Sequence, residues 1–184
     1  MKKLIITALS IASFSLAQAQ DCKEVKQEVD KFTKKETKVG TVIFGKIKVV
    51  SFKQSTKWAL TINQDAGKTQ IQTTIAALGE FNQTLDESTY FYFLLDNGEV
   101  VKLSNVIPAK PVTQAFGSGG ALTVYTTYQL TLEPTIEEMK KLASGNVTDV
   151  KVEISNQKIL SPNVDGKDAR KFKSIMACML ATAK

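Results

Sequence analysis

The chain has 184 residues, carries a formal net charge of +6 and contains two cysteines but no histidine. The missing histidine excludes Ser-His-Asp and Cys-His nucleophile systems and His-ligated zinc. The chain is mildly basic, but its only arginine is Arg170, so the composition argues against a nucleic-acid partner and is explained by solubility.

The first 19 residues have the three parts of a secretory signal peptide. Two lysines form the positive end, residues 4–16 form an uncharged apolar run, and residues 17–19 (AQA) fit a cleavage site. The apolar run is shorter than the about 20 residues that a membrane-spanning helix needs. We therefore expect cleavage after Ala19 and a soluble, periplasmic or secreted protein with no transmembrane segment, in which residues 20–184 form one domain.

Cys22 follows the predicted cleavage site, and the other cysteine is Cys178. A lipid-anchored cysteine would be the first mature residue, whereas Gln20 and Asp21 precede Cys22. In an oxidising compartment two cysteines are more often joined than separate. The sequence therefore favours a Cys22–Cys178 disulfide over two free thiols.

The N-terminal half predicts one helix followed by strands. Val25, Val29 and Phe32 have helical spacing, which indicates a short amphipathic helix within residues 22–35. Residues 39–52 are rich in Val, Ile and Phe, with Gly45 at a position typical of a β-bulge. Further strands are predicted at 57–63, where Trp58 faces inward, and at 69–75 after a turn.

The middle of the chain predicts a hairpin and a long strand. Residues 90–95 (YFYFLL) are apolar on both faces, which indicates a central strand covered on both sides. Residues 96–99 (DNGE) are a hairpin turn signal, so residues 100–106 return beside that strand. Residues 121–133 alternate as an amphipathic strand whose apolar face is Leu122, Val124, Tyr128, Leu130 and Leu132.

The C-terminal part predicts helix, strand and helix. Thr135 and Glu138 form a capping box, and Gly145 marks the end of that helix. A strand at 150–155 and a helix at 168–183 follow. Cys178 lies about 140° from the centre of the last helix's apolar stripe, so we expect it on the outer shoulder of the helix and outside the core.

Three groups of residues are candidates for binding. Lys46 and Lys48 would share one face of a strand in a lysine-rich region and could contact an anionic partner, such as a surface polymer or a membrane; a solvated strand face is the alternative. Residues 108–120 predict a binding loop that contains Phe116, Gly117, Gly119 and Gly120, or else an edge strand with a flexible hairpin. Trp58 and Tyr125, with Tyr90, Tyr92 and Tyr128, could form an aromatic platform or line a cavity, or else pack in the core.

No residue is predicted to be catalytic, and no metal or cofactor is expected. Residues 66–69 (AGKT) resemble the end of a phosphate-binding loop, but Ile62 stands where that loop needs glycine. Residues 163–168 lack the glycine at the sixth position of a calcium loop. Asp86, Glu99 and Glu133 leave only a carboxylate-based hydrolase open.

These patterns predict an α+β domain with a mainly antiparallel sheet of six to eight strands and helices on one side. The alternative is a closed β-barrel that resembles the lipocalins in size, export, strand content and C-terminal helix, although their G-x-W motif is absent. We expect a non-enzymatic binding protein for a partner protein or an anionic surface polymer. A carrier of a small apolar ligand is second and a hydrolase is third.

Overall fold

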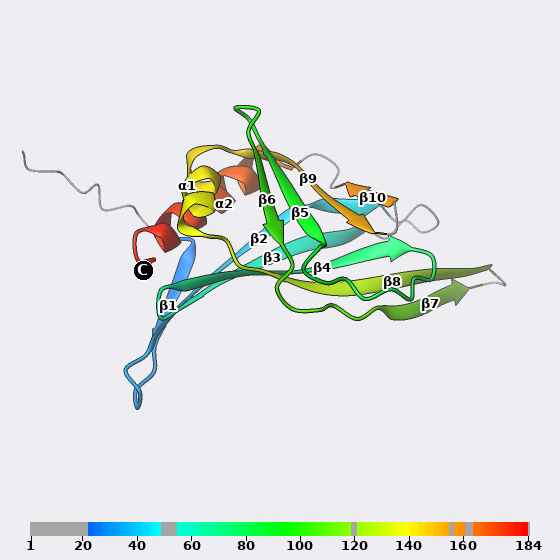
Figure 1. The fold of residues 1–184 in the computed structure, drawn as a ribbon, viewed down its shortest axis with the longest axis horizontal. Helices are drawn as coiled ribbons and strands as arrows, with labels where there is room; N and C mark the ends of the chain where they lie inside the picture. Colours follow the sequence, from blue (N-terminus) through cyan, green and yellow to red (C-terminus); the bar gives the residue numbers. More distant parts are fainter. Residues whose placement is uncertain (1–21, 49–54, 119–120, 155–156, 161–163, 184) are drawn as a thin grey trace, which may run out of the picture.

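The computed structural model describes residues 22–48, 55–118, 121–154, 157–160 and 164–183. These residues form an α+β fold of two antiparallel sheets and two helices, as predicted (Figure 1). In chain order the elements are β1 (Val25–Val29), β2 (Glu36–Lys48), β3 (Ser55–Asp65), β4 (Lys68–Leu78), β5 (Tyr90–Leu95), β6 (Val100–Ser104), β7 (Val112–Ser118), β8 (Ala121–Leu132), α1 (Ile136–Ser144), β9 (Val147–Ile154), β10 (Gln157–Leu160) and α2 (Gly166–Leu180).

The larger sheet has six strands in the order β1-β2-β3-β4-β8-β7, and the smaller has four in the order β10-β9-β5-β6. In the described residues β1 and β7 are the two ends of the larger sheet and do not pair with each other. The sheet is therefore open, and the lipocalin-like barrel is wrong. Division into two sheets, with the smaller sheet and the helices over one face of the larger, was not predicted.

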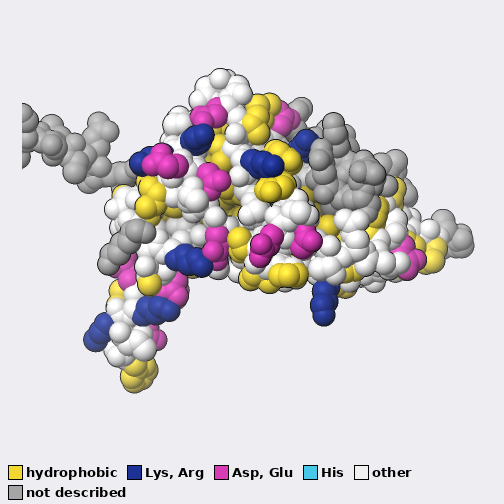
Figure 2. Space-filling view, viewed as in Figure 1, with side chains coloured by type: hydrophobic (Ala, Val, Ile, Leu, Met, Phe, Trp, Pro, Cys, Tyr) yellow, Lys and Arg dark blue, Asp and Glu magenta, His cyan; other side chains and the backbone are white. Residues whose placement is uncertain are grey.

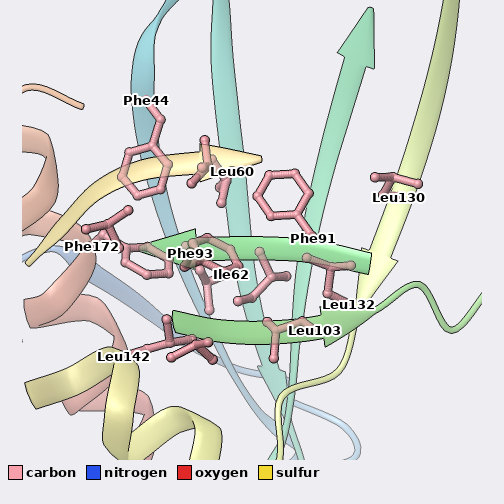
Figure 3. Close-up of a cluster of buried hydrophobic side chains, with 14 of the residues drawn as sticks. Phe44, Leu60, Ile62, Phe91, Phe93, Leu103, Leu130, Leu132, Leu142 and Phe172 are labelled. Carbon is pink, nitrogen blue, oxygen red and sulfur yellow. The ribbon is translucent and has the colours of Figure 1, made fainter. Parts of the chain in front are cut away.

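The core lies between these two layers (Figure 3). Trp58 of β3 meets Phe91 of β5 edge to face, with 5.4 Å between ring centroids. Phe172 of α2 lies 5.1 Å from Phe44 of β2 and 5.6 Å from Phe93 of β5. Aromatic pairs at these distances add about 1 kcal/mol each to the free energy gained by burial alone, so α2 and both sheets share one core.

The predicted β3–β4 turn, the inward face of β3 and the bulge in β2 are confirmed in the larger sheet. Trp58, Leu60 and Ile62 are fully buried, as their alternation indicates. Ala66 and Gly67 have φ values of 49° and 85°, the pair of positive angles that a two-residue hairpin turn requires. The β2–β3 register shifts between Ile43 and Lys46, which is the bulge expected around Gly45.

Strand β5 is central in its sheet, as predicted, but it is not covered on both sides. Phe91, Phe93 and Leu95 are buried, whereas Tyr90 and Tyr92 are half-buried on the outer face. Long lysine side chains shield these two tyrosines: Lys102 Nζ lies 3.5 Å from the Tyr90 ring centroid, and Lys151 Nζ lies 4.4 Å from that of Tyr92. A lysine that lays its stem over an aromatic ring replaces the expected second apolar layer.

Both C-terminal helices form close to their predicted positions. In α1 the Thr135 side chain accepts from the Glu138 N–H while the Glu138 carboxylate accepts from the Thr135 N–H, which is the expected capping box. Helix α2 lies tightly against β2 at Gly40. A Cβ built there would stand 2.7 Å from the Ile175 side chain, so the sheet has no room for a larger residue.

The predicted disulfide joins Cys22 to Cys178, which are 156 residues apart. It ties the start of the described chain to α2. Cys178 is only 3% exposed and is one of the buried residues of α2, so the expectation that it lies outside the core is wrong, although it is not part of the main hydrophobic cluster. The N-terminal segment, bonded through Cys22, lies beside this part of α2.

The amphipathic helix predicted within residues 22–35 is wrong. The segment forms β1 and a turn that leads into β2, with Val25 paired to Gly40 and Val29 to Glu36. Residues spaced by four share a face in a strand as well as in a helix, so Val25 and Val29 could not decide between the two. Phe32 alone suggested the helical period, and it lies in the turn, 95% exposed.

Candidate functional site

The candidate site is the backbone edge of β7, which is one of the two end strands of the larger sheet. It pairs on one side with β8, from Val112 opposite Thr127 to Ser118 opposite Ala121. Residues 112–115 are exposed in succession, so this part of β7 is covered on neither face. An edge strand of this kind presents a row of backbone N–H and C=O groups that can pair with another chain.

The four edge strands of the two sheets differ in charge. Strand β1 reads VKQEV, β6 reads VVKLS and β10 reads QKIL, and each therefore holds at least one charged residue. Strand β7 reads VTQAFGS and holds none. Charged side chains on an edge are a common protection against unwanted strand pairing. Of the edges described, β7 alone lacks this protection.

The inner face of the larger sheet, which packs against the smaller sheet and the helices, is left partly uncovered near β7. Along β8, Tyr128, Leu130 and Leu132 are buried, whereas Leu122 of the same face is 71% exposed. Val124 is half-buried and lies opposite the exposed Ala115 of β7. The apolar face predicted for residues 121–133 is thus buried in its second half and open in its first half.

The predicted loop at residues 108–120 is mostly strand. Phe116 and Gly117 belong to β7, which is the edge-strand alternative for this segment. Gly117 is exposed, whereas Gly119 and Gly120 lie outside the described residues. The binding role of these residues stays a prediction, now attached to an edge strand instead of a loop.

The predicted aromatic residues are not gathered on one surface. Trp58 is fully buried, and its Nε1 donates a hydrogen bond of 2.7 Å to Thr73 Oγ1. Tyr128 is 1% exposed, and burial raises the pKa of its phenol. Tyr125 is half-buried on the opposite face of β8. Trp58 and Tyr128 are core residues, which leaves Tyr125 as the member of the set nearest the open edge.

Lys46 and Lys48 occupy alternate positions of β2, so their backbone places them on the same face, as expected. Lys46 is paired in register with Lys57 of β3, and Lys48 with Ser55. A third lysine therefore stands beside the two predicted ones. Binding of an anionic partner by these residues stays a prediction.

A polar cluster at the C-terminal end of α2 was missed by sequence reasoning. Gln64 Nε2 donates to Met179 O at 2.8 Å, and Thr182 Oγ1 donates to Gln64 Oε1 at 2.6 Å. Lys38, only 8% exposed, donates to Thr182 Oγ1 at 3.1 Å and lies 3.4 Å from Glu36. No short motif marks this cluster, because its members are far apart in the chain.

This cluster borders a surface hollow of about 470 Å³. Its geometry is explained by the helix it adjoins. The last carbonyls of a helix have no intrahelical partner, and a cation near them is favoured by the helix dipole. Gln64 satisfies one such carbonyl and Lys38 brings a positive charge to the same end. The cluster therefore has a structural role in ending α2.

The acids considered for a hydrolase are each held by a local partner. Glu133 lies 2.8 Å from Lys68 and accepts from Gln70 at 2.6 Å; the Lys68 bond is the largest cause that lowers its pKa. Glu99 lies 3.1 Å from Lys141, and Asp86 accepts from Ser88. In the described residues no three His, Cys, Asp or Glu side chains lie together as a metal site would require.

Comparison with protein families, curated proteins and solved structures finds no match for this chain. Its function is therefore inferred from its own residues. Neither of the two helices in the described ranges is both long and apolar enough to span a bilayer.

Proposed function

We propose that this chain is an exported, non-enzymatic binding protein that pairs an extended segment of a partner protein with the edge of β7. The observation that carries the proposal is the absence of charge on β7, in contrast to the other three edge strands. An extended peptide can add to such an edge as a further strand, with main-chain hydrogen bonds that supply affinity and alternate side chains that supply specificity.

The open inner face beside β7 supports the same proposal. A strand added to β7 would send alternate side chains over Ala115, Val124 and Leu122. Covering the 71% exposed Leu122 would remove apolar surface from water, at about 25 cal/mol for each Å² buried. The expected partner segment is therefore extended and carries apolar residues at alternate positions.

Export is supported by two features. The chain has a signal-like N-terminal sequence, and its two cysteines form a disulfide, which persists in oxidising compartments. The surface polymer predicted from Lys46 and Lys48 remains a second type of partner without a described binding geometry. The carrier and the hydrolase stay predictions, and the described geometry favours neither. The core between the layers is filled by fully buried side chains, and the acids named above have separate partners.

A peptide selection tests the proposal. A library of random peptides is selected against the oxidised protein, and the selected peptides are titrated against Ala115→Lys and, as a matched control on another edge strand, Val100→Lys. Ala115 lies in the open inner face, so a lysine there would have to be buried under the peptide without a partner. We expect Ala115→Lys to weaken binding at least about tenfold and Val100→Lys to leave it unchanged. Peptides that bind both variants equally would contradict the edge as the binding site.

A further inference from the structure

The turn between β1 and β2 exposes a phenylalanine at the end of a projection. This hairpin extends away from the body of the molecule (Figure 1), and Phe32 in its turn is 95% exposed. Figure 2 shows a hydrophobic side chain at the end of the projection, with charged side chains along its stem. Val29, the last residue of β1, is also 54% exposed. Single exposed apolar side chains are common on protein surfaces, so the inference rests on the fixed shape of this turn and on the charges beside Phe32.

Hydrogen bonds hold this turn in one shape. Asp30 Oδ1 accepts from the N–H of Phe32 at 2.9 Å, from the N–H of Thr33 at 2.6 Å and from Thr33 Oγ1 at 2.9 Å. The Lys34 N–H donates to Asp30 O, and the Asp30 N–H donates to Lys35 O, both at 2.9 Å. Lys34 adopts a φ of 58°, a left-handed conformation that costs free energy in a residue other than glycine. The exposure of Phe32 is therefore built into the turn.

The charges around Phe32 are mostly positive. Lys31, Lys34 and Lys35 lie in the turn with one acid, Asp30, whose carboxylate is engaged by the turn itself. Lys35 lies 2.5 Å from Asp65. Among the described residues, Lys31 and Lys34 form no ion pair, so their charges are available to an anionic surface.

We propose that this tip binds the surface of an anionic lipid bilayer, with Phe32 inserted at the boundary between headgroups and acyl chains and Lys31 and Lys34 against the headgroups. Aromatic side chains favour this boundary, and lysines beside it are attracted by anionic lipids. A protein partner fits the tip less well, because a stable protein interface buries about 800 Å² on each side and a projecting turn offers little surface to a rigid partner.

The inference is independent of the proposed strand addition at β7. The tip lies at one end of the larger sheet in Figure 1, and the β7–β8 hairpin reaches the other end. Binding of the tip to a bilayer would therefore leave the β7 edge free for a protein partner.

Vesicle co-sedimentation tests the inference. The protein is produced from Gln20 onward, because all described elements lie beyond it, and this form keeps the apolar residues 4–16 out of the assay. Vesicles of phosphatidylcholine are compared with vesicles that also contain phosphatidylglycerol. We expect binding to the anionic vesicles only, reduced about tenfold by Phe32→Ser and restored by Phe32→Trp. The Leu78→Ser control, at an apolar residue of β4 that is 56% exposed, should bind as the unchanged protein does.

The two lysines of the tip are tested beside control variants that each remove one positive charge elsewhere on the protein. Lys31→Gln and Lys34→Asn should each weaken binding to anionic vesicles about fivefold, whereas Lys110→Gln and Lys167→Gln should have little effect. Asparagine is used at position 34 because it tolerates a positive φ. Phe32 is exposed in the turn, so we expect its variants to stay folded, and a thermal melt of each variant checks this.

Three results would overturn the inference. One is a failure of the unchanged protein to sediment with anionic vesicles. The second is an equal loss in the control lysine variants, which would indicate attraction by net charge alone. The third is binding to a soluble polyanion that Phe32→Ser leaves intact while vesicle binding is absent, which would assign the lysines to a polymer.

Discussion

The two end strands of the larger sheet are protected in different ways. Strand β1 is short, carries Lys26 and Glu28, and follows directly on a disulfide that ties Cys22 to α2. Strand β7 carries no charge and pairs only with β8; its residues 112–115 are exposed in succession, as residues 26–29 of β1 are. One edge is guarded by charge and anchored covalently, whereas the other is open. Of the four edges in the described residues, three carry charge and β7 does not, and the proposed strand addition rests on this difference.

Removal of the disulfide should have the largest effect on stability and should act on the β1 end. The disulfide closes a loop of 156 residues, for which the chain-entropy relation gives about 5 kcal/mol of the free energy of unfolding. Cys22→Ser with Cys178→Ala is compared with the oxidised protein by urea unfolding. Peptide binding at β7, measured well below the unfolding midpoint, should be unchanged. A double variant as stable as the oxidised protein would show that the covalent anchor of β1 is dispensable.

Asn105→Leu should have the next largest effect on stability, and it should act on the segment that leads into β7. Asn105 is fully buried; its Nδ2 donates to Leu85 O and Ile107 O, and its Oδ1 accepts from the Thr131 N–H. Leucine has a similar size but leaves the buried Thr131 N–H without its acceptor and removes one donor from Ile107 O and from Leu85 O, which keeps the Ala109 N–H. We therefore expect a loss of about 2 kcal/mol in the free energy of unfolding. Thermal unfolding of this variant beside exposed Ser88→Ala measures it, and a loss no larger than the control's would contradict the role of Asn105.

Single proline substitutions at two adjacent residues of β7 distinguish the backbone groups on its solvent side from those that pair with β8. Backbone N–H groups of an edge strand point alternately to its neighbour and to solvent, so Thr113→Pro and Gln114→Pro each remove a different kind. One variant should lose about 2 kcal/mol of stability because a hydrogen bond to β8 is lost. The other should keep its stability and lose peptide binding. Equal binding by both variants would argue against strand addition.

A small pH-dependent effect is expected at Glu133, beside the β3–β4 turn. Its pKa is lowered, chiefly by Lys68 and also by Gln70. The stability from this carboxylate is therefore present above its unfolded pKa and is lost as the pH falls through its folded pKa. Glu133→Gln should cost less than about 1 kcal/mol at neutral pH, and the difference should vanish in acid. Urea unfolding across pH, with exposed Glu87→Gln as control, measures it.

Much of the fold could be predicted because single strands and turns are locally encoded. The alternation around Trp58, the turn at Ala66 and Gly67, the capping box at Thr135 and the disulfide all agree with their sequence signals. The β1 segment could not be assigned in the same way, since the four-residue spacing of Val25 and Val29 suits both helix and strand. Division into two sheets depends on contacts between distant residues, such as Trp58 with Phe91, which a single sequence does not encode locally.

The candidate site was predicted only as a segment. The sequence pointed to residues 108–120, and the structure places Phe116 and Gly117 within this segment on an edge strand. The openness of β7 depends on which strands end each sheet, and no local pattern specifies that order. Similarly, Leu122 belongs to a face that is buried further along β8, and its exposure follows only from where the second layer ends.

Amide hydrogen exchange along β7, with and without a selected peptide, tests the central proposal most directly. Strand addition predicts that alternate amides within residues 112–118 become protected on binding, while those of β1 and β6 do not change. Protection confined to another element, or binding that leaves the β7 amides as exchangeable as before, would contradict it.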